Sequence, residues 1–151
     1  MSIKEKLQED WKQAMKARDK FRAETISTAR SAILFVEKTQ GIQLEEAQVI
    51  EILAKEVKQR NEAILEFQKG NRQDLVDKAM AQNEILLSYL PQQLSEQEIY
   101  EIIEQSAISA GANSIKDMGK VMALIRPKTV GRADGKLVSA LVKDYLSKNN
   151  Q

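Results

Sequence analysis

Apolar residues recur three and four positions apart along successive segments of this chain of 151 residues. That spacing places side chains on one face of an α-helix. Helix-forming Ala, Leu, Lys, Glu and Gln dominate the composition, and only six glycines and two prolines interrupt it. The pattern and the composition together predict an all-α protein.

Four apolar stripes precede Pro91, and the first follows a capping-box sequence, Ser2 with Glu5. A charged run at residues 16–20 predicts a turn after the first stripe. Gly41 predicts the end of the second helix, and Gly70-Asn71 the end of the third. The stripes are Ile3, Leu7, Trp11, Ala14 and Met15; Ile26, Ala29, Ile33 and Val36; Val49, Leu53, Val57, Ile64 and Phe67; and Leu75, Ala79, Met80 and Ile85 to Leu87.

The segment Leu-Pro-Gln-Gln-Leu at residues 90–94 is the strongest candidate domain boundary, because Pro91 cannot continue a helix. We therefore expect two subdomains, residues 1–91 and residues 95–151. A second capping box, Ser95 with Glu98, opens the C-terminal part, where we expect three short helices. A module this small buries a small share of its surface and should be only marginally stable.

Within the C-terminal part, Ser114 with Asp117 is expected to cap the second helix, and Pro127 to end it. Asp134 is expected to cap the last helix. Met118 and Met122 are interpreted as core packing.

The chain contains no cysteine and no histidine. This excludes disulfides, thiolate nucleophiles, Ser-His-Asp catalysis and metal sites built on imidazole or thiolate. No apolar run is long enough to span a bilayer, and residues 1–20 alternate charged and apolar residues, unlike a signal peptide. We expect a cytoplasmic protein with no cofactor, no metal ion and no membrane partner.

The net charge of +1 conceals two oppositely charged segments. Residues 71–110 contain two basic and seven acidic residues, a net charge of −5, whereas residues 111–151 contain eight basic and three acidic residues, a net charge of +5. A basic module behind an acidic segment indicates a surface that faces a polyanion.

The basic segment contains a glycine loop, Gly131-Arg-Ala-Asp-Gly135-Lys136. It does not match a nucleotide-binding Walker A loop, because three residues separate the glycines where four are needed and Leu137 follows the lysine. A loop that feeds a helix N-terminus can still offer backbone N–H groups to a phosphate. The structural alternative is a simple turn with a capped helix and solubilising charges. The candidate nucleic-acid-binding residues are Lys116, Lys120, Arg126, Lys128, Gly131, Arg132, Gly135 and Lys136.

Two pairs of carboxylates, Glu45 with Glu46 and Glu101 with Glu104, are candidates for acid–base chemistry. Both pairs lie on faces that the helical pattern predicts to be exposed, and nothing in the sequence indicates the burial that acid–base chemistry by a carboxylate needs. We therefore assign no catalytic residue.

The segments Asp117-Met-Gly-Lys-Val-Met122 and Gly131-Arg-Ala-Asp-Gly-Lys136 resemble those of the YqeY family. Lys55-Glu-Val-Lys-Gln-Arg60 and Tyr89-Leu-Pro-Gln-Gln-Leu-Ser95 add to the resemblance, which covers nearly the whole chain. The YqeY proteins are stand-alone relatives of the tail domain of GatB, the B subunit of the tRNA-dependent amidotransferase. The resemblance implies an N-terminal helical-hairpin subdomain followed by a small three-helix subdomain. It also implies contact with tRNA, because the GatB tail is a tRNA-contacting appendage.

Three functions follow as hypotheses. The first is a non-catalytic accessory protein of translation that binds tRNA or another structured RNA through phosphates. The second is an adaptor whose long helices bind an amidotransferase or aminoacyl-tRNA synthetase. The third is a carbon–nitrogen ligase that uses glutamine as amide donor, which the family label suggests. This last activity is not expected of the chain alone, because it lacks the ATP site and the Ser-Ser-Lys amidase signature of those enzymes.

Overall fold

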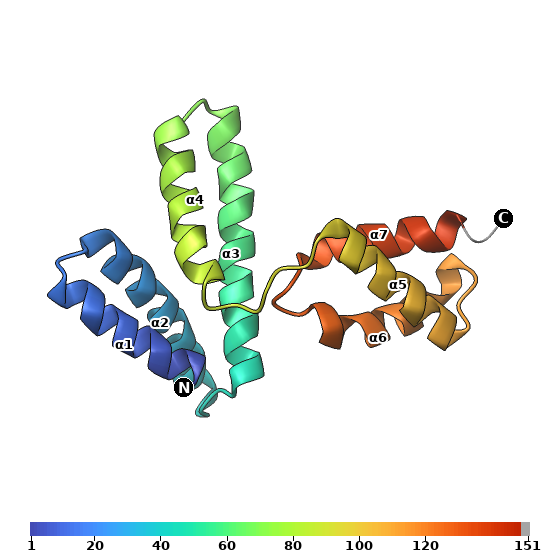
Figure 1. Cartoon of the computed structure of the whole chain (residues 1–151), viewed down its shortest axis with the longest axis horizontal. Coiled ribbons are helices and arrows are strands. Elements are labelled where there is room, and N and C mark those ends of the chain that lie inside the picture. The colour runs from blue at the N-terminus through green and yellow to red at the C-terminus, as the bar shows by residue number, and fades with distance from the viewer. Residues whose placement is uncertain (149–151) are drawn as a thin grey trace. The chain divides into compact units, whose positions relative to one another are not determined.

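The computed structural model describes residues 1–148, and every regular element in that range is a helix, which confirms the all-α prediction (Figure 1). The elements are α1 (Ile3–Lys16), α2 (Lys20–Gln40), α3 (Glu46–Lys69), α4 (Gln73–Leu87), α5 (Glu96–Ala110), the 3₁₀ turn η1 (Ile115–Asp117), α6 (Met118–Thr129) and α7 (Gly135–Lys148). Contacts group the chain into two compact units, Met1–Pro91 and Gln92–Gln151, and each is described by itself. None of the helices described is both long and apolar enough to cross a membrane.

The unit Met1–Pro91 consists of two antiparallel helix pairs, α1 with α2 and α3 with α4 (Figure 1). The predicted capping box opens α1: Ser2 Oγ accepts from the Glu5 N–H at 3.1 Å, and the Glu5 carboxylate accepts from the Ser2 N–H at 3.4 Å. Gly41 ends α2 in the left-handed conformation with φ of 66°. Asn71 takes the same conformation, φ 56°, between α3 and α4. The predicted helix ends in this unit are therefore confirmed.

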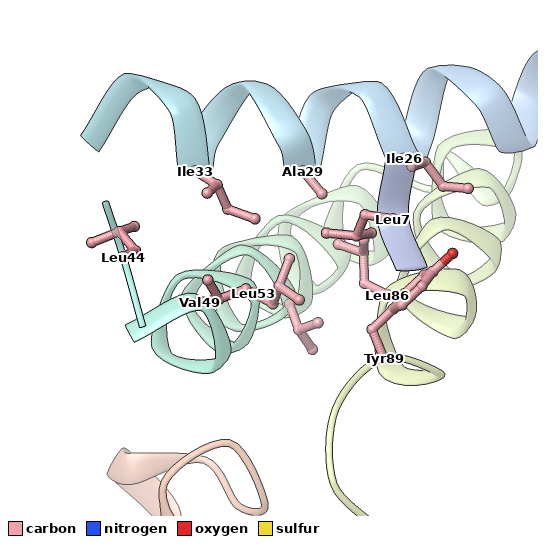
Figure 2. Close-up of a cluster of buried hydrophobic side chains, with 10 residues drawn as sticks. Leu7, Ile26, Ala29, Ile33, Leu44, Val49, Leu53, Leu86 and Tyr89 are labelled. Atoms are coloured by element: carbon pink, nitrogen blue, oxygen red, sulfur yellow. The ribbon is translucent and has the colours of Figure 1, made fainter. Parts of the chain in front are cut away.

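The core of this unit gathers side chains from all four helices, as Figure 2 shows. Leu7 from α1, Ile26 from α2, Leu53 from α3 and Leu86 from α4 are each at most 1% exposed. Leu44, in the loop before α3, covers the same cluster. Burial of the four apolar stripes thus explains why each helix presents the face that it does.

Two methionines assigned to the apolar stripes lie outside the core. Met15 is 55% exposed and Met80 is 56% exposed. In α1 the buried residues are Leu7 and Ala14, seven positions apart on one face. Met15 is turned by about 100° from Ala14 and falls beyond the side that α2 covers. Spacing alone could not show how narrow the buried face is.

Tyr89 ties the end of this unit to its first helices. Its side chain is 6% exposed, and its hydroxyl donates to Asp10 Oδ2 at 2.5 Å. Arg22 Nη2 lies 3.9 Å from the same carboxylate oxygen. Burial first, and then the hydrogen bond to the anionic Asp10, raise the pKa of the Tyr89 hydroxyl well above its ordinary value.

We expect Tyr89→Phe to lower the free energy of unfolding by about 1.5–3 kcal/mol at pH 7, since it removes one hydrogen bond to a charged acceptor. The raised pKa also has a consequence at high pH. The contribution of the hydroxyl is fully present below about pH 10, the unfolded value, and is lost as the pH rises toward the folded value. We expect the free energy of unfolding, measured with urea, to decrease less between pH 7 and pH 10.5 in Tyr89→Phe than in the wild type. Equal losses would contradict this assignment.

The α-helices of the unit Gln92–Gln151 in the described range are α5, α6 and α7 (Figure 1). Each of them buries one face in a common core. Ile103, Val121, Ile125, Val142 and Leu146 are all at 0% exposure. Ser95 Oγ accepts from the Glu98 N–H at 3.1 Å in the second predicted capping box. Met118 and Met122 pack against this core, which confirms their interpretation.

The predicted end of α6 at Pro127 is wrong, because the helix includes this proline and continues to Thr129. Pro127 lacks the N–H that would bond to the carbonyl of Ala123, and its ring crowds that carbonyl. Ala123 is exposed, so water can solvate that carbonyl. The Val130 N–H then closes the last turn on the Arg126 carbonyl at 3.0 Å.

The predicted cap of α6 by Ser114 with Asp117 is also wrong in detail. The Ser114 side chain makes no capping hydrogen bond, and a 3₁₀ turn precedes the helix. Asp117 Oδ2 instead accepts from the backbone N–H of Asn113 at 3.2 Å. The carboxylate therefore organises the loop before the helix and not the first turn within it.

Candidate nucleic-acid interface

The loop between α6 and α7 is built around Gly131, which is buried and has φ of 73°. Residues with a Cβ rarely adopt this left-handed backbone conformation. The Gly131 carbonyl accepts from Gln93 Nε2 at 2.7 Å. Gly131 is therefore a turn glycine whose carbonyl is already bound to the linker after Pro91.

Asp134 caps α7 as predicted. Its Oδ1 accepts from the Lys136 N–H at 3.0 Å, and its carbonyl accepts from the Val138 N–H at 3.0 Å. The carboxylate also offsets the positive end of the helix dipole. A phosphate at this helix start would have to displace Asp134 to reach the Lys136 N–H. Backbone capture of a phosphate here is therefore disfavoured relative to contact with basic side chains.

Arg132 is half-buried against the linker, a role that the sequence did not indicate. Its Nε donates to the Gln92 carbonyl at 3.1 Å, and its own carbonyl accepts from the Leu94 N–H at 2.8 Å. The pKa of the Glu98 carboxyl is lowered, first by hydrogen bonds from Ser95 and to a smaller extent by the charge of Arg132. Arg132 thus serves the fold of the loop, and part of its charge already faces a carboxylate.

The basic side chains of α6 point in different directions. Lys120, Arg126 and Lys128 are exposed. At about 100° per residue, Arg126 and Lys128 lie roughly 160° apart around the helix, on its two flanks. Lys120 and Lys128 lie roughly 80° apart and about 12 Å along the axis, so they share one side.

The eight candidate residues therefore fall into groups and do not form one cluster. Lys116 in η1 and Lys120 lie at the start of α6. Arg126 and Lys128 lie in its last turn, followed by the loop with Arg132 and by Lys136 in the first turn of α7. Gly131 makes the turn, and Gly135 is the first residue of α7, where an added Cβ would meet nothing within 4 Å.

The carboxylate pairs show no sign of acid–base chemistry. Glu45, Glu46, Glu101 and Glu104 are exposed, as expected. Glu46 Oε1 has a structural partner, the Ile3 N–H at 2.9 Å. No cluster of three or more acidic side chains within residues 1–148 is arranged to hold a metal ion.

Comparison with known proteins gives a family and several relatives. The YqeY family, described as Yqey-like protein, matches residues 4–146. A protein of Pyrenophora tritici-repentis named altered inheritance of mitochondria protein 41, mitochondrial, is 29% identical over 93% of this chain and 79% of that protein. A protein of the same name from Lachancea thermotolerans is 39% identical over 57% of this chain and 46% of its own length. An uncharacterized protein of Schizosaccharomyces pombe is 33% identical over 54% of this chain and 67% of its own length.

The names of these relatives correct one prediction. The expectation of a cytoplasmic protein is overturned, because the similar proteins whose names give a location are named as mitochondrial. The expected family resemblance, by contrast, is confirmed over nearly the full length. Because the YqeY family matches residues 4–146 and the described residues form a helical fold, the chain belongs to the YqeY family.

Proposed function

We propose that this protein is a non-catalytic accessory protein that binds structured RNA, with tRNA as the expected ligand. The observation that carries the proposal is the charge of the C-terminal segment, +5 over residues 111–151. Its basic side chains extend from a small three-helix unit, and all the basic candidates except half-buried Arg132 are exposed at residue level. The chain belongs to the YqeY family, and the resemblance of that family to the tRNA-contacting GatB tail implies the same kind of ligand.

Recognition is expected to rest on phosphates and shape. Tyr100 and Tyr145, the aromatic residues of this unit, pack edge to face on each other at 5.6 Å between ring centroids. Neither ring is therefore offered as a platform for stacking an unpaired base. Contacts from lysine and arginine to phosphates release counterions, so affinity should fall steeply as salt rises.

The test is binding of the purified protein to bulk tRNA at 50 mM and 200 mM salt, with duplex DNA as competitor. Lys120→Gln with Lys128→Gln removes two cations on one side of α6 and should reduce the slope of log affinity against log salt by about 2. Lys38→Gln with Lys55→Gln, two exposed lysines of the other unit, is the matched control and should leave the slope unchanged. An affinity that does not change with salt, or no binding at 50 mM, would reject the proposal.

A protein adaptor is the second candidate function, and a groove between α3 and α4 favours it. The groove has a volume of about 530 Å³ and is lined by apolar Ile64, Met80 and Leu87, with Asp77 and Glu84 beside them. Met80 is 56% exposed and adapts readily to a partner surface. In this case Met80→Lys would abolish a complex with a synthetase or amidotransferase subunit, whereas loss of Lys120 and Lys128 would leave it intact.

A further inference from the structure

The turn between α1 and α2 carries a second group of basic side chains, far in sequence from the first. We define the basic tip as Lys12, Met15, Lys16, Arg18 and Lys20. All five are exposed, and Met15 is the apolar member. The one acidic residue among residues 12–20, Asp19, uses Oδ1 to accept from the Arg22 N–H at 3.1 Å. Figure 1 shows this turn at one end of the α1–α2 pair.

Arg18 is in an unusual backbone conformation for its residue type. Its φ is 59°, in the left-handed region. At every other left-handed position among residues 1–148 the chain has a glycine (Gly41, Gly111, Gly131) or an asparagine (Asn71). Those residues are the ones that tolerate this region, whereas an arginine there costs about 1 kcal/mol or more. A glycine at position 18 would make the folded state more stable than the arginine does.

Lys20 breaks a second local rule. It is the first residue of α2, whose first turn contains no acidic residue. The helix N-terminus carries a positive partial charge, so a cation there is destabilising. Lys16 differs, because it lies in the last turn of α1, where a cation is favoured. Arg18 and Lys20, on either side of the N-cap residue Asp19, are thus two cations that stability does not explain, and such departures are typical of functional positions.

We propose that the basic tip is a second surface that contacts the phosphates of structured RNA, separate from the basic side chains of residues 116–136. This inference rests on the proposed function, since it assumes that the chain binds RNA. A bilayer surface fits less well, because binding there needs a wide apolar face. Met15 is the tip's single exposed large apolar residue. Linked surfaces that engage the same RNA at once raise the affinity through effective concentration.

The discriminating variant is Arg18→Gly with Lys20→Gln, because it should separate binding from stability. Glycine relieves the left-handed backbone, and glutamine relieves the helix dipole, so the thermal midpoint should stay equal to that of the wild type or rise. The slope of log affinity for bulk tRNA against log salt should nevertheless fall by about 1 to 2. Lys38→Gln with Lys55→Gln removes the same charge elsewhere in this unit and should leave the slope unchanged. Its thermal midpoint should not rise, because Lys38 lies in the last turn of α2, where a cation is favoured.

Each outcome decides a different point. If the wild type binds tRNA and the Arg18→Gly/Lys20→Gln variant has the same affinity and the same salt slope, the basic tip is not a contact surface. The proposed function is unaffected by that result. A wild type that does not bind at 50 mM salt rejects the function itself. A lower thermal midpoint in the variant contradicts the claim that these residues oppose stability. If the Arg18→Gly/Lys20→Gln variant loses binding to phosphatidylserine vesicles that the wild type has, while its tRNA binding is unchanged, the proposal is overturned. The ligand of the basic tip is then a membrane surface and not RNA.

Discussion

Ile103→Ala is expected to destabilise the C-terminal unit by about 2–5 kcal/mol, whereas Ile108→Ala should change its stability by less than about 0.5 kcal/mol. Both residues lie on α5, five positions apart. Ile103 is at 0% exposure in the core against α6 and α7, and Ile108 is 71% exposed. The two substitutions remove the same atoms from the same helix, so the difference isolates burial from helix propensity.

The consequence of Ile103→Ala should be large because the unit is small. About 60 residues bury a modest share of their surface, and a domain of this size has only a few kcal/mol of stability to lose. Urea unfolding followed by circular dichroism should show part of the helical signal lost at much lower urea. Leu7 and Leu53 lie in a separate core, so the transition of residues 1–91 should not move. Equal midpoints for Ile103→Ala and Ile108→Ala would contradict this account of the core.

The helices could be predicted from the sequence because local signals agree with burial. Ser2 with Glu5 and Ser95 with Glu98 form capping boxes, and Gly41 ends a helix in the left-handed conformation. These features depend on residues three to five positions apart, which the sequence displays directly. The predictions that a helix ends at Pro127 and that Met15 belongs to the apolar stripe are wrong for another reason. The tolerance of a proline in a last turn, and the width of a buried face, depend on what the neighbouring helices cover.

The candidate site was less predictable than the fold, because its residues have tertiary partners. Asp134 was recognised as a cap, a local relation. The hydrogen bond from Arg132 to the Gln92 carbonyl joins residues 40 positions apart, and no spacing rule reveals it. The structure therefore assigns different roles to the candidate residues than the sequence indicated. Substitution of the exposed Lys120 and Lys128 tests phosphate contact without disturbing the loop. Substitution of Arg132 would also remove its hydrogen bond to the Gln92 carbonyl.

The linker and the glycine loop form one structural element. Gln93 binds the Gly131 carbonyl, and the Leu94 N–H binds the Arg132 carbonyl at 2.8 Å. Arg132 in turn binds the Gln92 carbonyl. Three hydrogen bonds thus fix the first residues of the C-terminal unit to the loop before α7. A residue that changes the backbone of this loop should disturb the linker as well.

Gly131→Val is expected to destabilise the C-terminal unit by about 1–3 kcal/mol, and Gly135→Ala to be neutral or stabilising by up to about 1 kcal/mol. Gly131 is buried with φ of 73°, a conformation that a β-branched residue strongly disfavours. Gly135 begins α7 without a positive φ, and an added Cβ there meets nothing within 4 Å. Thermal unfolding of the two variants measures this difference.

The same pair also separates the structural role of the loop from a role in binding phosphate. If the loop only makes the turn, Gly135→Ala keeps the wild-type affinity for tRNA. If a phosphate approaches the backbone at the start of α7, the added methyl group weakens binding while stability stays the same or increases. A stable Gly135→Ala variant with reduced affinity would therefore restore the backbone contact that the Asp134 cap disfavours. A Gly131→Val variant as stable as the wild type would instead contradict the left-handed turn on which this description of the loop depends.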